Sequence, residues 1–244
     1  MIGCTCSVCT SSNPHNKRLR PSVLITVGKK RVLIDAGPDF RAQALRHHID
    51  HLDGMLLTHS HFDHVAGLDE LRIYYLRHRK PLPVLLSEPT LLALKRRYDY
   101  FFQAKNLNQS LPAQLEFHVL EQERGTLSFL DLEIGYMRFE QGGMQVTGYR
   151  IGSFAYISDI RVYPETIFTD LAGVKTLVLS ALRTETSLMH FNLDEALAFS
   201  QKVGAQETYF THMGHELEHE KTNALLPAGV QLAYDGLKVE FTYG

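Results

Sequence analysis

The densest group of reactive side chains in this sequence lies in residues 58–64, which read T-H-S-H-F-D-H. Four of these residues have side chains that bind divalent metals: His59, His61, Asp63 and His64. In an extended chain the first two point to the same side and bind one ion, whereas the last two follow a turn and face a second. Two ions roughly 3.5–4 Å apart form a dinuclear hydrolytic centre. A solvated polar loop is the alternative, but the apolar strand predicted just before the segment favours the metal site.

Three later side chains have the chemistry needed to complete such a centre: Asp159, His190 and His212. Asp159 ends a predicted strand, where its carboxylate would bridge two ions, although a turn cap or a helix N-cap is the alternative. His212 follows another predicted strand in a second Thr-His pair. His190 stands just before a predicted helix and, taken alone, would be more typical of a surface histidine. The context of the other ligands favours all three as site residues.

The three cysteines, Cys4, Cys6 and Cys9, lie within six positions near the N-terminus. An odd number of cysteines this close together cannot form a disulfide framework and suits a soft metal ion better. Three free thiols on a frayed terminus are the alternative. We therefore expect a second kind of metal site, built on thiolates.

The composition bounds the class of protein. The chain has 244 residues, of which 44% are hydrophobic and 21% charged, as expected for one soluble domain over residues 1–244. Its 25 Lys and Arg nearly balance 27 Asp and Glu, so the net charge of -2 provides no general attraction for nucleic acid or an anionic membrane. We find neither a membrane-length apolar run nor a signal peptide and expect a cytoplasmic protein with no membrane partner.

The elements that must position these side chains alternate along the chain. Many strands with scattered helices favour an α+β fold, in which two sheets pack together and helices cover them as an αββα sandwich of four layers. The predicted strands span residues 22–27, 31–35, 55–57, 82–86, 115–120, 127–139, 145–151, 154–158, 176–179, 207–210 and 237–242. The predicted helices span residues 39–48, 88–102, 164–171, 193–203 and 216–224.

Taken together, these residues resemble the metallo-β-lactamase superfamily. The resemblance rests on the H-x-H-x-D-H segment, on V-L-I-D-A-G at residues 32–37, on the strand-end Asp159 and on the Thr-His pair of His212. Within the superfamily, the chain is similar to the PhnP-like phosphodiesterases over nearly its whole length. That similarity is carried by G-C-T-C-S-V-C at residues 3–9, G-Y-R-I at 148–151, H-F-N-L-D-E-A at 190–196 and T-H-M-G-H at 211–215.

The resemblance implies hydrolysis of a small, cyclic or nucleotide-derived phosphodiester by a metal-activated hydroxide. Asp63 and His190 are the implied catalytic side chains, with His190 as proton donor to the leaving group. Asp35 would orient a ligand histidine, and a turn cap is the alternative role. The implied ligands of one or two catalytic Zn2+ or Mn2+ ions are His59, His61, Asp63, His64, Asp159 and His212. The implied ligands of a structural zinc are Cys4, Cys6, Cys9 and His215.

The chain departs from the family in two places. The family's first strand, which precedes the cysteines, is missing, and Gln141 stands where the family has a histidine ligand. An amide oxygen is a hard ligand that suits Mg2+ or Mn2+ better than zinc, so Gln141 is a degenerate ligand. The alternatives are therefore a catalytically impaired metal-binding descendant, a tRNA-processing nuclease and an iron oxidoreductase. The absence of a basic arm argues against the nuclease, and the oligomeric state stays open between monomer and homodimer.

Overall fold

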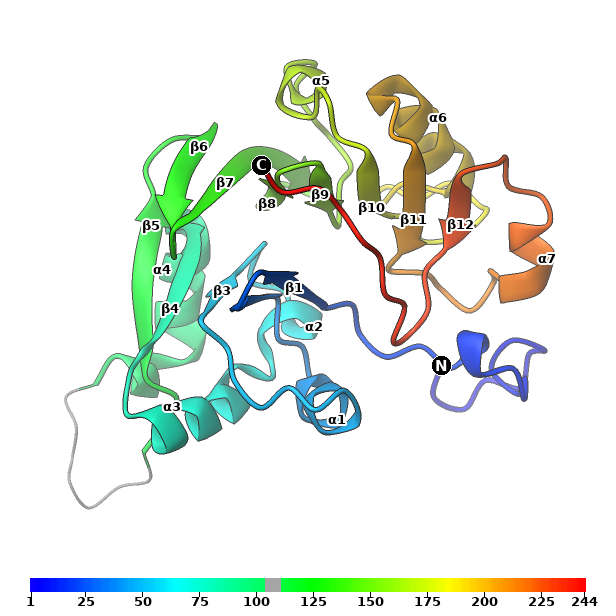
Figure 1. Ribbon diagram of the computed structural model, residues 1–244. Coiled ribbons are helices and arrows are strands. Elements are labelled where there is room, and N and C mark those ends of the chain that lie inside the picture. Colours follow the sequence, from blue (N-terminus) through cyan, green and yellow to red (C-terminus); the bar gives the residue numbers. More distant parts are fainter. Residues whose placement is uncertain (104–110) are drawn as a thin grey trace. The chain divides into compact units, whose positions relative to one another are not determined.

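The computed structural model describes residues 1–103 and 111–244, which form two compact units (Figure 1). The smaller unit comprises Arg20–Glu123 and Ser128–Leu132. The larger unit comprises Met1–Leu19, Arg124–Leu127 and Glu133–Gly244. The expectation that residues 1–244 form one domain stays a prediction.

The smaller unit is built on a five-stranded sheet with the order β1-β2-β3-β4-β5. The first two strands are antiparallel and all later pairs are parallel. Parallel strands need covered faces, and the buried apolar side chains of β3 and β4 fit that requirement. The strands are β1 (Val23–Val27), β2 (Lys30–Ile34), β3 (Gly54–Leu56), β4 (Leu82–Ser87) and β5 (Leu115–Leu120).

Helix α4 packs against β4 and β5 in this unit (Figure 1). Its N-terminus is capped by Ser87, whose side chain accepts a hydrogen bond from the backbone of Thr90. The helix ends at Arg97 rather than at the predicted residue 102, because Tyr98 leaves the helical region. The helical elements are α1 (Phe40–Arg46), α2 (Phe62–Val65), η2 (Leu68–Leu71), α3 (Arg72–His78), α4 (Glu88–Arg97) and η3 (Asp99–Phe101).

The larger unit carries most of a seven-stranded sheet with the order β12-β11-β10-β9-β8-β7-β6. Strands β9 to β12 run parallel, whereas β8 is antiparallel to both β7 and β9. The strands are β6 (Arg124–Phe129), β7 (Leu132–Gln141), β8 (Met144–Ile151), β9 (Phe154–Ile157), β10 (Thr176–Ser180), β11 (Glu207–Thr211) and β12 (Val230–Leu232).

Helix α6 lies behind β10 and β11 in Figure 1 and closes the apolar core of the larger unit with Ala196 and Phe199. Asn192 and Glu195 form a reciprocal capping box at its start, and Gly204 ends it in the left-handed region. The helical elements of this unit are η1 (Pro14–Asn16), α5 (Ile167–Asp170), α6 (Leu193–Val203) and α7 (His219–Asn223).

The predicted α+β class is confirmed, but two predicted strands are wrong. Residues 127–139 are not one strand, because Leu130 and Asp131 adopt φ of 57° and 62° and turn the chain between β6 and β7. Residues 237–242 form no strand, and hydrogen bonds between Ser153 and Thr242 hold this segment instead. The described chain contains no helix long and apolar enough to cross a membrane.

Candidate functional site

Three of the predicted site residues share an uncommon backbone conformation. Asp35, Asp159 and His212 have φ of 59°, 59° and 58°, and each follows closely on a strand. Side chains other than glycine rarely adopt this region, and such strain persists only where the surroundings fix it. The sharp turn it produces directs each side chain at the end of its strand.

In the smaller unit, the buried carboxylate of Asp35 collects three hydrogen bonds. Oδ1 accepts one from the backbone N–H of Thr58 at 2.9 Å. Oδ2 accepts one from the Thr58 hydroxyl and lies 2.7 Å from Nδ1 of His64. Asp35 and His64 are both fully buried, so these bonds form away from water. This geometry supports the predicted role of Asp35 in orienting a histidine and adds a link to Thr58.

These bonds decide which nitrogens of the histidines carry protons. His64 donates from Nδ1 to Asp35, which leaves its Nε2 unprotonated. The Thr58 hydroxyl uses its hydrogen on Asp35 and therefore accepts from Nδ1 of His59 at 3.0 Å. Nε2 of His59 then keeps its lone pair, 3.0 Å from Nδ1 of His61. Two nitrogens on one tetrahedral zinc lie roughly 3.3 Å apart, so this pair fits a shared cation.

Asp63 completes the set in the smaller unit. It lies in the first turn of α2, and Oδ2 is 4.0 Å from Nε2 of His64 and 3.4 Å from Nη1 of Arg20. Its side chain is only 20% exposed. The structure thus brings together the four metal-binding side chains of residues 58–64, as the spacing predicted.

In the larger unit, Asp159 gathers the other predicted residues. Its Oδ1 lies 3.5 Å from Nδ1 of His190 and 3.3 Å from Nε2 of His212, and the two imidazoles stack with centroids 5.0 Å apart. The Ser158 hydroxyl donates to Oδ2. Asp159 is almost fully buried, so a metal ion or a protonated imidazole must balance its charge. One carboxylate with two imidazoles is a donor set that binds a divalent metal.

Gln141 ends β7 and points at the same carboxylate. Its Nε2 donates to Oδ1 of Asp159 at 3.0 Å and lies 3.0 Å from Nε2 of His190. Its Oε1 is buried and has no hydrogen-bond partner among the described residues. A buried carbonyl oxygen without a donor costs free energy that a hard cation would recover. Gln141 therefore lies where the resemblance expects a metal ligand.

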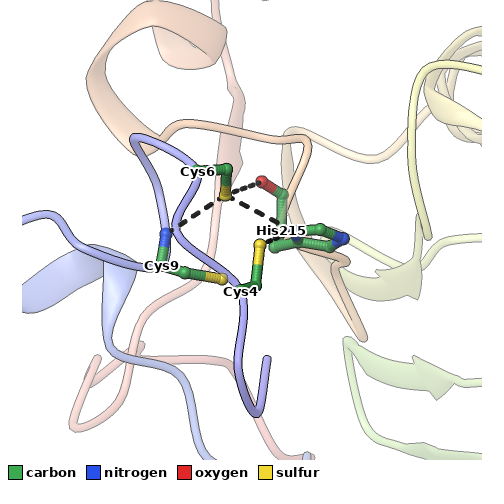
Figure 2. Close-up of side chains that lie close together, drawn as sticks. All are labelled: Cys4, Cys6, Cys9 and His215. Carbon is green, nitrogen blue, oxygen red and sulfur yellow. Dashed lines mark hydrogen bonds between the residues drawn. The ribbon is translucent and has the colours of Figure 1, made fainter.

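The cysteines form a separate cluster within the larger unit. Figure 2 shows Cys4, Cys6 and Cys9 on the N-terminal loop with their sulfur atoms directed toward the ring of His215. Nδ1 of His215 lies 3.3 Å from Sγ of Cys4 and 3.4 Å from Sγ of Cys6. Tetrahedral zinc with bonds of 2.3 Å to sulfur and about 2.0 Å to nitrogen separates these atoms by roughly 3.5 Å. The four side chains therefore fit one closed zinc site.

The loop also favours a thiolate. The backbone N–H of Cys9 donates to Sγ of Cys6, and with His215 nearby this lowers the pKa of the Cys6 thiol to about 6. A thiol with this pKa is mostly deprotonated at neutral pH, as a metal ligand must be.

Further bonds tie the N-terminal loop to the segment that follows β11. Arg18, which the sequence did not single out, donates to the carbonyl oxygens of Gly214 and Leu217 at 3.0 and 2.6 Å. Asn16 donates to Glu218 and accepts from the backbone of His219. No local pattern marks Arg18 or Asn16, because their partners lie about 200 residues away.

Replacement of Cys6 by Ser should remove about one zinc ion per chain and lower the melting temperature, because a hydroxyl is a poor substitute for a thiolate. Thr5→Ala, an exposed change in the same loop, is the control. Metal analysis and thermal unfolding measure the two effects. A Cys6→Ser protein with the parent's zinc content and melting temperature would show that the cysteines do not bind zinc.

Replacement of Asp35 by Asn should weaken metal binding by about 10- to 100-fold, because an amide cannot accept from both Thr58 and His64. The buried mismatch should also cost ~1–3 kcal/mol of stability. Asp131→Asn removes an exposed pair with Lys30 and should change neither quantity. Parent-like metal affinity in Asp35→Asn, measured by calorimetric titration, would leave Asp35 as a turn cap alone.

Comparison with known proteins identifies the family. The profile of the β-lactamase superfamily domain matches residues 30–213. A diphosphatase of the PhnP family, known from its crystal structure, is 40% identical, covers 99% of this chain and 92% of its own, and superimposes with a TM-score of 0.90. The chain belongs to the PhnP family of the metallo-β-lactamase superfamily.

Two curated relatives extend the comparison. A Porphyromonas gingivalis protein named octanoyltransferase is 35% identical over 97% of this chain, which corresponds to 48% of its own length. The PhnP-family chain described here thus spans about half of that relative. Ribonuclease Z from Bradyrhizobium diazoefficiens is 41% identical over 64 residues, which is 25% of this chain and 21% of its own.

Proposed function

We propose that this PhnP-family chain is a metal-dependent phosphodiesterase that cleaves small, including cyclic, phosphodiesters. The observation that carries the proposal is the similarity to a PhnP-family diphosphatase over 99% of the chain. Diphosphatases and phosphodiesterases both transfer a substituted phosphoryl group to water, so the same kind of site can serve either bond. Ribonuclease Z matches only a quarter of the chain, which supports small substrates less directly contradicted by the balanced charge.

The chain's own residues fit divalent metal ions. The histidines and carboxylate of residues 58–64 are one part of the proposed ligand set, and Asp159 with His212 is the other. Bound Zn2+ or Mn2+ would lower the pKa of a coordinated water to about 7 and polarise phosphoryl oxygens. The residues around the ligands contribute orientation, because Asp35 fixes the ring nitrogens of His64 directly and of His59 through Thr58.

His190 is the proposed proton donor to the leaving group. Its side chain is 15% exposed, so substrate can reach it, and the Asp159 carboxylate at 3.5 Å stabilises its protonated form. The capping box of α6 begins two residues later and fixes the backbone that carries the ring. Asp63, the second proposed catalytic side chain, holds metal and contacts Arg20.

The proposal is tested with protein purified without added metal, analysed for its metal content and then assayed with Mn2+ or Zn2+. The substrates are bis(p-nitrophenyl) phosphate, a 2′,3′-cyclic nucleotide, a dinucleotide with a diphosphate bridge and an unprocessed tRNA. We expect zinc in the preparation and hydrolysis of the small diesters. Faster cleavage of the diphosphate bridge would make the chain a diphosphatase, and cleavage of tRNA alone would make it a nuclease. One zinc and no hydrolysis would indicate an impaired descendant, and bound iron an oxidoreductase.

Replacement of His190 by Ala should slow hydrolysis by about 10²- to 10⁴-fold for diesters with alkoxide leaving groups, because these need a proton. The loss should shrink for p-nitrophenolate, a stable anion. Metal content should stay that of the parent. His78→Ala, an exposed change on α3, is the control. An equal loss for both classes of leaving group would assign His190 to substrate positioning instead.

Replacement of Gln141 by His should tighten the weaker catalytic metal site and raise activity at low metal concentration, since imidazole is a better zinc ligand than an amide oxygen. Gln206→His, at an exposed position of the same unit, is the control for an added histidine. The measurement is activity as a function of added Zn2+ and Mn2+. Identical titration curves for parent and Gln141→His would show that position 141 binds no metal.

A further inference from the structure

One arginine beside the metal-binding segment of the smaller unit has a fixed backbone and a largely exposed charge. Arg20 lies 3.4 Å from Oδ2 of Asp63 through Nη1, and 57% of its side chain is exposed. Asp63 is its only hydrogen-bond partner among the described residues. At least four of the five N–H groups of the guanidinium are thus available to a ligand.

The backbone of Arg20 is held on both sides. Its N–H donates to Oδ2 of Asp39 at 2.8 Å, and its carbonyl oxygen accepts from Nε2 of Gln43 at the same distance. Pro21 follows it and restricts Arg20 to extended conformations. The charge therefore projects from a fixed base rather than from a free loop.

Gly37 explains how Arg20 comes so close to the metal-binding segment. A Cβ atom at position 37 would lie 2.1 Å from the carbonyl oxygen of Asp63 and 3.3 Å from Cβ of Arg20. Only glycine permits this approach. The chain is therefore built so that Arg20, Gly37 and Asp63 meet.

The other basic side chains near the segment are less suited to hold a ligand. Arg97 donates to the carbonyl oxygen of Ser60, so it holds the metal-binding loop itself. The predicted phosphate-binding candidates on and after α3 are exposed, and the one with a described bond, Arg77, contacts the backbone of Asp50. Exposed basic helices are usually solvated faces. These exposed candidates are Arg72, Arg77, His78, Arg79 and Lys80.

We propose that Arg20 binds the phosphoryl group of the substrate through its planar fork while its Nη1 stays on Asp63. The proposal rests on the proposed phosphodiesterase function. A guanidinium matches two phosphate oxygens at once, and its charge offsets that of the diester. Because Arg20 also contacts a proposed metal ligand, the bound phosphoryl group lies beside the metal. Arg20 thus determines specificity for an anionic phosphoryl group.

The test compares Arg20→Ala and Arg20→Lys with Arg41→Ala, an exposed arginine change on α1. All proteins are saturated with Mn2+, and the measured quantities are kcat, KM, metal affinity and the inhibition constant of inorganic phosphate. We expect Arg20→Ala to raise KM and the phosphate inhibition constant by about 10- to 100-fold, the usual effect of losing a charged hydrogen bond. The kcat should change little, because binding in ground and transition states is lost together. Arg20→Lys, which keeps the charge without the fork, should fall between.

Two results would overturn the proposal. Unchanged phosphate inhibition at saturating metal, with weaker metal binding, would show that Arg20 only orients Asp63. Unchanged values throughout would make Arg20 a solvated surface residue. If the parent cleaves no diester, the proposed function fails, but calorimetric titration of the metal-loaded proteins with inorganic phosphate still decides the role of Arg20. Weaker phosphate binding in both variants would then support it.

Discussion

The buried carboxylate of Asp35 is the interaction on which the metal-binding half of the smaller unit depends. A carboxylate without contact to water is stable only when donors surround it, and here Thr58 and His64 supply three hydrogen bonds. Backbone bonds join the same elements, because Asp35 donates to Leu56 and Ala36 donates to His64. The end of β2, the end of β3 and helix α2 are therefore coupled. Each histidine in the segment takes its ring orientation from this arrangement.

The larger unit reaches a similar result with sheet register. Strands β9, β10 and β11 are parallel, and Ile157 pairs with Leu179 while Thr211 pairs with Ser180. Their carboxyl ends therefore meet at one edge of the sheet. Asp159 and His212 follow β9 and β11 in left-handed conformations, which brings their side chains within 3.3 Å although 53 positions of sequence numbering, as 212 minus 159, separate them. A strand between them is no obstacle, because both side chains lie beyond its end.

The sequence predicted what depends on local pattern and on residue type. The spacing in residues 58–64, the capped helix α6 and the strand-end position of Asp159 each follow from a few neighbouring residues. The turn at Leu130 and Asp131 was missed because neither is a usual turn glycine or asparagine. Strand β12 was missed because three residues give too short a pattern, and it forms only by pairing with β11. Long-range contacts leave no local trace.

The same limit explains why the importance of the N-terminal loop is clear only from the structure. Residues 212–218, which follow β11, contain no helix or strand, so nothing within the segment fixes His212. Arg18 binds two carbonyl oxygens there, and the cysteine cluster meets the segment at His215. An irregular segment with so many partners loses little entropy when a ligand binds, because that cost is met on folding. A zinc ion held by the cysteines would therefore act on catalysis through position alone, by fixing the segment three residues from His212.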